Sequence, residues 1–168
     1  YELNVVKGAQ ELLETRIPAV ERLTLPEFVL RSLETLANCH GWAGREEAAL
    51  AALDRLQAYA LRYRFDRILG HALALKIRHH LRRGATGEAI ELASQLDRLS
   101  RQYDGSGTVP GQLRECLARA RIELALQGRD FAGAASQLAT LVAAQPAPLH
   151  KSAAELQLQW AIACQALG

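Results

Sequence analysis

Aromatic residues are scarce in this chain: Phe, Trp and Tyr together make up 5% of its 168 residues. Few rings leave few platforms on which nucleic-acid bases could stack. A dominant charge is also lacking, because 18 acidic residues nearly balance 20 Lys and Arg, for a net charge of +2. The chain as a whole therefore carries no electrostatic footprint of a protein that binds nucleic acid or a membrane surface.

Long apolar runs and a secretion signal are missing as well. No apolar run approaches the roughly 20 residues needed to span a bilayer, and no signal-peptide pattern is found. The three cysteines, Cys39, Cys116 and Cys164, lie far apart and form no C-x-x-C motif. An odd number of separated cysteines favours free thiols in a reducing compartment. We therefore predict a cytoplasmic protein whose cysteines are small buried apolar residues.

What the chain does contain is helical periodicity. Within residues 66–99, Leu69, Leu73, Ile77 and Leu81 recur every four residues and so lie along one helical face. A turn at 83–87 follows, and residues 89–99 then repeat the spacing of three and four. Gly84 stands where a helix end needs left-handed dihedrals. The stretch predicts a helical hairpin.

This hairpin recurs along the chain. The segment GREEAALAALDRL at Gly44–Leu56 matches GEAIELASQLDRL at Gly87–Leu99, and SQLATL at Ser136–Leu141 matches the end of the latter. The closing leucines of the three copies are 43 and 42 residues apart. Glycines that we predict to stop helices follow at intervals of 43, 44 and 40, namely Gly41, Gly84, Gly128 and Gly168. A fixed period of this size is typical of stacked helical repeats.

The sequence thus predicts an all-α, tetratricopeptide-like α-solenoid of about eight antiparallel helices, forming a single domain over residues 1–168. The expected helices are 5–22, 26–40, 45–63, 67–83, 86–103, 110–127, 131–144 and 150–167, with Thr24, Asp66 and Asp130 as N-terminal caps. The central six pair into units at 26–63, 66–103 and 109–144. A start at Tyr1 instead of Met suggests a fragment of a longer protein.

A helix ending in Gly, a short turn and a second helix rich in Ala and Leu form the tetratricopeptide arrangement. With their longer period, HALALKIRHHLRRGATGEAIELASQLDRL, ALQGRDFAGAASQLATLV and GREEAALAALDRL resemble the helical-repeat region of MalT-like, LuxR-family regulators. The resemblance implies an activator with a nucleotide-binding switch, a signal-receiving repeat domain and a helix-turn-helix that binds DNA. Only the middle part is present. No G-x-x-x-x-G-K-[ST] phosphate loop occurs, so we predict no nucleotide cofactor here. No short helix of recognition type follows a three-residue turn at the C-terminus, so we predict no direct DNA contact.

Arg67, His71, Arg78 and Arg82 fall on a single helical face, and in tetratricopeptide folds the first helix of each unit lines a groove. Arg114 and Arg121 occupy a comparable stripe. Guanidinium groups suit anionic or planar polar ligands, so these six residues are the candidate binding groove. The alternative is a solvated face with cations near the helix C-terminus.

Other chemistry finds little support. His79 and His80 diverge by about 100° on a helix and are poorly placed to chelate one ion, so no metal site is predicted. His80 is the one expected to pack in the core, and Trp42 and Trp160 are expected to join neighbouring units. No grouping of nucleophile and base is found, so we predict no catalytic residues, no cofactor and no enzyme activity.

Two functions remain open. The first is a domain of a LuxR/MalT-type transcriptional regulator that receives a small-molecule inducer or a regulatory protein. Its other partners would be the nucleotide-binding and DNA-binding domains of the parent chain, or a second copy of itself. The alternative is a free-standing tetratricopeptide scaffold that binds a peptide segment of another protein.

Overall fold

The computed structural model describes residues 2–23, 25–103, 105–143, 158 and 161–166, and its regular structure there is entirely α-helical. The helices are α1 (Glu2–Leu23), α2 (Pro26–Trp42), α3 (Glu46–Tyr63), α4 (Asp66–Arg82), α5 (Thr86–Arg101), α6 (Thr108–Gln127) and α7 (Phe131–Ala143). The chain therefore has the predicted all-α helical-repeat fold. Residues 161–166 are helical, and the rest of the predicted helix 150–167 lies outside the described residues, apart from position 158, which is also helical.

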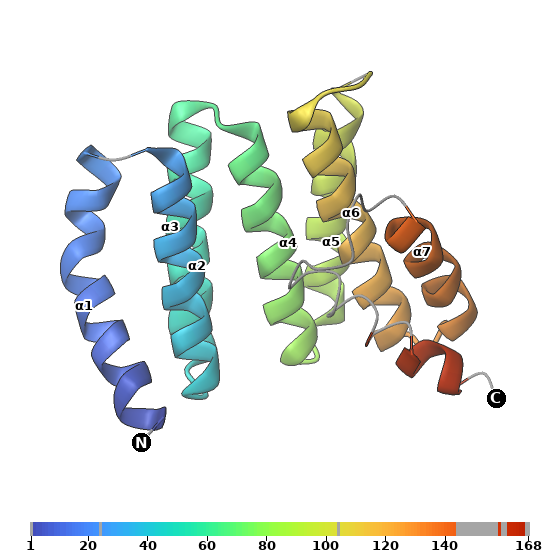
Figure 1. Ribbon diagram of the computed structural model, residues 1–168, viewed down its shortest axis with the longest axis horizontal. Coiled ribbons are helices and arrows are strands. Elements are labelled where there is room, and N and C mark those ends of the chain that lie inside the picture. The colour runs from blue at the N-terminus through green and yellow to red at the C-terminus, as the bar shows by residue number, and fades with distance from the viewer. Residues whose placement is uncertain (1, 24, 104, 144–157, 159–160, 167–168) are drawn as a thin grey trace.

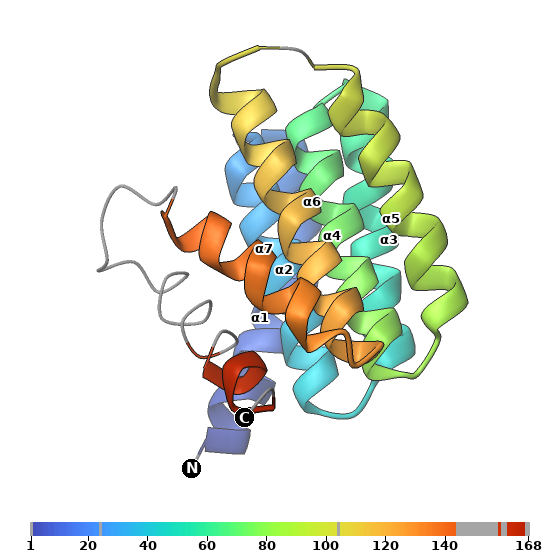
Figure 2. The same ribbon diagram turned by 90° about the vertical axis from the view of Figure 1, so that its right-hand side faces the viewer.

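Successive helices lie side by side along the molecule, from α1 at one end to α7 at the other (Figure 1). The view along this stack shows α2, α4 and α6 in one row and α3 and α5 in a second row (Figure 2). Helix α4 contacts α3, α5 and α6, and α6 contacts α4, α5 and α7. The hairpins α2/α3, α4/α5 and α6/α7 are thus the three predicted units, and their first helices are neighbours.

One turn geometry joins α2 to α3, α3 to α4, α4 to α5 and α6 to α7. In each such turn one residue is left-handed, and the next residue's amide donates to a carbonyl of the preceding helix, as in Arg45 N to His40 O at 2.9 Å. The left-handed residues are Gly44 (φ 71°), Arg64 (φ 55°), Gly84 (φ 74°) and Arg129 (φ 59°). Equivalent turns therefore place the three hairpins 40 and 45 residues apart.

This register corrects the glycine spacing read from the sequence. Gly41 lies inside α2, and Gly128 has a φ of −76°, so neither is the left-handed residue of its turn. The structural equivalents of Gly84 are Gly44 and Arg129. The sequence match is shifted by three residues, which is nearly one helical turn, so both alignments keep leucines on the same face.

The core follows the predicted leucine stripes. Leu73, Ile77 and Leu81 are buried along α4. Leu53 and Leu96, of the matched repeats, are fully buried between helices, as is Leu138. Each such side chain contributes about 1.5–3 kcal/mol to folding relative to an exposed one.

Several local predictions are wrong. Trp42 is 70% exposed and joins no neighbouring unit, while Trp160 lies outside the described residues. Asp66 is not an N-cap: it is the first residue of α4, and its carboxylate accepts a hydrogen bond from Tyr103. Asp130 does cap α7, because its Oδ1 accepts the Gly133 amide at 2.9 Å.

The capping box predicted before α2 is not the observed start. Leu25 is the N-cap and makes no side-chain bond, while Thr24 lies outside the described residues. Pro18, of a residue type that often kinks or ends a helix, lies inside α1. Among the cysteines, Cys39 and Cys116 are buried as predicted, whereas Cys164 is exposed. Burial raises the pKa of the Cys116 thiol to about 12. None of the helices in the described part is long and apolar enough to cross a membrane.

Candidate binding face

The equivalent turns bring matching positions of α2, α4 and α6 next to one another, and these positions carry charge. Arg67 of α4 forms an ion pair with Glu27 of α2, which lies 40 residues earlier in the same place on its helix. On the other side, Arg78 donates to Glu123 Oε1 of α6 through Nε at 2.8 Å, and its NH2 lies 2.7 Å from the same oxygen. The two arginines therefore tie α4 to both neighbouring first helices.

His71 lies between these ion pairs on α4. It is half-buried, and desolvation lowers the pKa of its imidazole. Arg67 and Arg31 lower it further, while Glu34 and Glu115 oppose the shift. With a pKa below the usual 6.5, the ring is neutral at pH 7 and has one donor and one acceptor nitrogen.

Two further pairs complete this surface. Arg31 donates to Glu34 at 2.9 Å on α2, and Arg119 donates to Glu115 at 3.0 and 3.1 Å on α6. We call the set of nine side chains the charge layer: Glu27, Arg31, Glu34, Arg67, His71, Arg78, Glu115, Arg119 and Glu123. Its four arginines match its four glutamates, so the layer is electrically balanced.

The balance sets what this surface can bind. Each arginine already donates to a carboxylate, so a simple anion would have to displace that carboxylate and leave it uncompensated. An occupant with both donors and acceptors can replace an Arg–Glu pair group by group. The arrangement thus suits polar or amphoteric occupants.

The other three predicted residues lie elsewhere. Arg121 donates to Asp97 of α5 at 2.8 Å, and Arg114 donates to the Gly105 carbonyl at 3.1 Å, so both face the α5 side of α6. Arg82 is exposed at the end of α4, near the α2/α3 turn. The structure therefore brings together Arg67, His71 and Arg78 but not Arg82, Arg114 and Arg121.

Sequence reasoning did not include the acidic half of the layer, Arg31 or Arg119 in the candidate groove. It sought residues of one charge on one helix, whereas the partners of Arg67 and Arg78 lie on the neighbouring helices. The repeat spacing of 43 and 42 residues read from the sequence does not align these partners, whereas the turn-based spacing of the structure does. At the turn-based spacing of 40 residues, Glu27 aligns with Arg67, and at 45 residues Arg78 aligns with Glu123.

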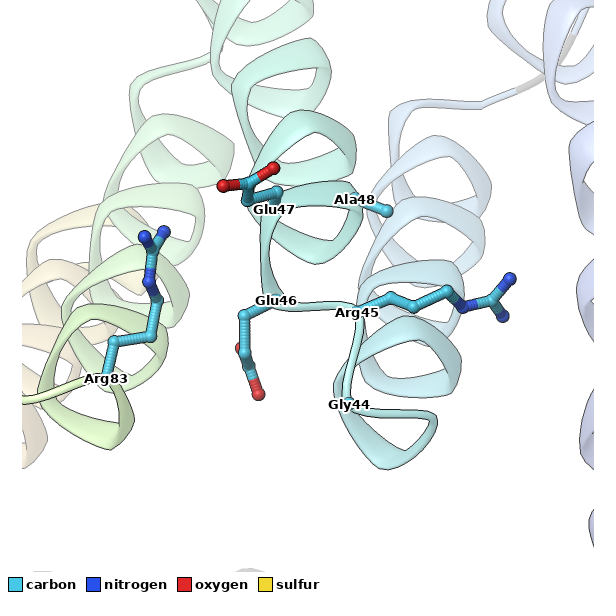
Figure 3. A pocket seen from close by; sticks show the side chains of 6 residues that line it. All are labelled: Gly44, Arg45, Glu46, Glu47, Ala48 and Arg83. Atoms are coloured by element: carbon cyan, nitrogen blue, oxygen red, sulfur yellow. The ribbon is translucent and has the colours of Figure 1, made fainter.

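A shallow hollow lies at the opposite end of these helices from the α3/α4 turn, lined by Gly44, Arg45, Glu46, Glu47, Ala48 and Arg83 (Figure 3). Glu46 and Glu47 begin α3, and Arg83 stands across from them at the end of α4. Arg45 points away from the hollow and donates to Gln10 of α1. The hollow is a junction between two hairpins with charges of both signs.

A buried histidine lies beside this junction. His79 is 1% exposed, and its Nδ1 lies 2.8 Å from Glu46 Oε2, which joins the end of α4 to the start of α3. The sequence placed His80 in this role, but His80 is only half-buried, and burial lowers the pKa of its imidazole. No group of three His, Cys, Asp or Glu side chains in the described part is placed to hold a metal ion.

Comparison of the chain with protein-family models, with curated proteins and with solved structures gives no match.

Proposed function

We propose that the chain is the signal-receiving helical-repeat domain of a cytoplasmic LuxR/MalT-type transcriptional regulator, and that the charge layer is its receiving surface. It acts by binding, without catalysing a reaction. The proposal is supported by the three repeated hairpins and by the resemblance of their sequences to such regulators.

The single observation that carries the proposal is that ion pairs of the layer cross from hairpin to hairpin. Arg67 reaches α2 and Arg78 reaches α6. An occupant that takes over either guanidinium releases a contact between neighbouring hairpins. Because hairpins in a stack contact mainly their neighbours, such a change passes along the stack. A coupling of about 1–3 kcal/mol is typical for linkage of this kind.

The signal is a small-molecule inducer or a regulatory protein, and the layer favours one with donors and acceptors in similar number. Uncharged polyols and amphoteric molecules meet this condition. A highly charged anion does not, because it leaves Glu27 or Glu123 without a cation. This preference is strongest at Glu123, whose side chain is 14% exposed, since an unpaired carboxylate with little access to water is costly.

A free-standing scaffold that binds a peptide is the second candidate, and the extent of the layer favours it. The nine side chains run across three helices, which is a longer path than a small ligand needs. A peptide main chain offers one donor and one acceptor for each residue and so matches a balanced surface.

Binding of a panel of inducers and peptides to the 168-residue chain, measured by calorimetry, tests the surface. Arg78→Gln should weaken binding of the active compound by about tenfold, because it removes a charge-assisted donor. Arg98→Gln is the matched control, since Arg98 is exposed on α5, away from the layer. Equal affinity of the two variants would reject the charge layer as the receiving surface.

The coding sequence on either side of these residues tests the class of protein. We expect a nucleotide-binding domain with a phosphate loop upstream and a helix-turn-helix downstream. Finding neither would reject the regulator and leave the scaffold. If a ligand binds the parent protein but never the isolated chain, the signal is received outside this domain.

A further inference from the structure

The corner between α3 and α4 holds a third of the aromatic side chains of this chain. Tyr59, Tyr63 and Phe65 lie within seven consecutive residues, and the whole chain has nine Phe, Tyr and Trp residues. The Tyr59 and Tyr63 centroids are 4.9 Å apart, and Tyr63 and Phe65 stack at 6.0 Å with an angle of 23°. The corner lies at the upper end of the molecule in Figure 1.

Part of this cluster faces solvent together with an aliphatic side chain. Tyr63 is 47% exposed, and Leu61, two residues earlier on α3, is 57% exposed. Tyr59 and Phe65 are partly buried against the core, and both rings contact the Tyr63 ring. Because residues two positions apart on a helix do not face each other, the exposed part of Tyr63 alone forms an apolar ledge at the end of α3.

The ledge is flanked by two exposed arginines. The Arg62 guanidinium carbon lies 5.5 Å from the Tyr63 ring centroid, over the ring. Within the described residues, neither Arg62 nor Arg64 pairs with an acid. Glu21 near this corner is paired with Arg55, and Asp66 accepts a hydrogen bond from the neutral Tyr103 hydroxyl, so the two arginines outnumber the remaining negative charge of Asp66. The corner is therefore positively charged, unlike the balanced charge layer.

Arg64 occupies a position where its backbone favours glycine. Its φ of 55° matches those of Gly44 and Gly84, the equivalent residues of two other turns. A side chain with Cβ is disfavoured in this conformation, so an arginine lowers stability relative to glycine there. Backbone strain of this kind is often retained where the side chain serves a function.

We propose that the α3/α4 corner is a docking site for an acidic peptide segment of a partner protein that carries apolar side chains. An apolar side chain of the segment packs against the exposed part of Tyr63, and its carboxylates pair with Arg62 and Arg64. The complementary charge identifies the occupant, because the exposed groups are two guanidiniums beside an apolar ledge. Single-stranded nucleic acid fits less well, since Phe65 and Arg62 already stack on the Tyr63 ring.

Fluorescence anisotropy of the 168-residue chain with a short labelled peptide of alternating glutamate and leucine tests this site. Binding should weaken as salt is raised. Arg64→Gly should weaken it by about tenfold, because one charge-assisted pair is lost. The same variant keeps the turn and should not lower the melting temperature, so lost binding would not reflect lost folding.

Arg129→Gly is the matched control. Arg129 is the other left-handed arginine, in the α6/α7 turn, and its replacement relieves the same backbone strain far from the corner. It should leave peptide affinity unchanged. Equal affinity of the Arg64→Gly variant and the unaltered chain would overturn the proposal.

Three further outcomes would also overturn it. A peptide with lysine in place of glutamate should not bind, and equal binding would remove the role of charge. An oligonucleotide that binds more tightly than the acidic peptide would identify the site as a nucleic-acid surface. Sedimentation of the chain alone should show no self-association that depends on Arg64. Self-association that Arg64→Gly abolishes would identify a second copy of the chain as the occupant.

Discussion

Gly70 of α4 is the position where a single methyl group should reveal how closely α4 and α6 pack. A Cβ added at Gly70 would lie inside the contact distance of Leu113 Cδ2 of α6 and 3.6 Å from Leu96 Cδ1 of α5. Both leucines are fully buried, so neither side chain has free space into which it can turn. The absence of a side chain at Gly70 thus lets the second and third hairpins meet.

Two opposing effects set the size of the Gly70→Ala change. Alanine in a helix interior is favoured over glycine by about 0.5–1 kcal/mol. Extra atoms in a packed core cost about 1–3 kcal/mol. We therefore expect a net loss of about 1 kcal/mol, which lowers the melting temperature of a chain of this size by roughly 2–4 °C.

Urea and thermal unfolding followed by circular dichroism would measure this loss. Gly8→Ala is the matched control, because Gly8 is in α1 with nothing within 4 Å, and it should gain about 0.5–1 kcal/mol. In the double variant Gly70→Ala/Leu113→Ala, the new methyl occupies the space that the leucine leaves. The stability lost by the double variant should therefore be smaller than the sum of the losses of the two single variants. A gain in stability for Gly70→Ala equal to that for Gly8→Ala would refute the close α4–α6 contact.

Three further predictions concern charge and backbone. Arg64→Gly should raise the free energy of unfolding by about 1 kcal/mol, measured by urea titration, because it relieves a left-handed non-glycine residue. Arg78→Gln should lower it by about 1–3 kcal/mol, because it leaves Glu123, only 14% exposed, without its cation; adding Glu123→Gln should restore part of the loss. Stability should also fall as pH drops below about 6.5, because the lowered pKa of His71 means that the unfolded chain binds the proton first; His71→Gln should flatten this fall in a pH series of melts.

The hairpins could be predicted from the sequence because their signals are local. Leucine spacing and the turn at Gly84 depend on residues within one helix or one turn, and the helix ends agree with the structure to within a few residues. The register between hairpins was harder to predict from the sequence. Gly41 and Gly44 both stand near the end of α2, and only the backbone shows that Gly44 makes the turn.

The charge layer could be predicted only in part, for a related reason. The arginines of α4 stand out as a run of one charge, but their partners are single glutamates on helices about 40 residues away. Pairing depends on which helices are neighbours, and a periodicity within one helix does not contain that information. The same limit explains why His80 was placed in the core instead of His79, which finds Glu46 on α3.

The glycine at position 70 also decides the order in which the hairpins can be joined. Counted back from the left-handed turn residue, Gly70 in α4 corresponds to Leu30 in α2. Excising residues 45–84 would join two identical turns and set α2 directly against α6, but Leu30 would then meet Leu113. Helix α4 therefore packs against α6 without a clash, whereas α2 in its place would clash. Deletion of this hairpin should thus destabilise the stack, even though the two turns have the same geometry.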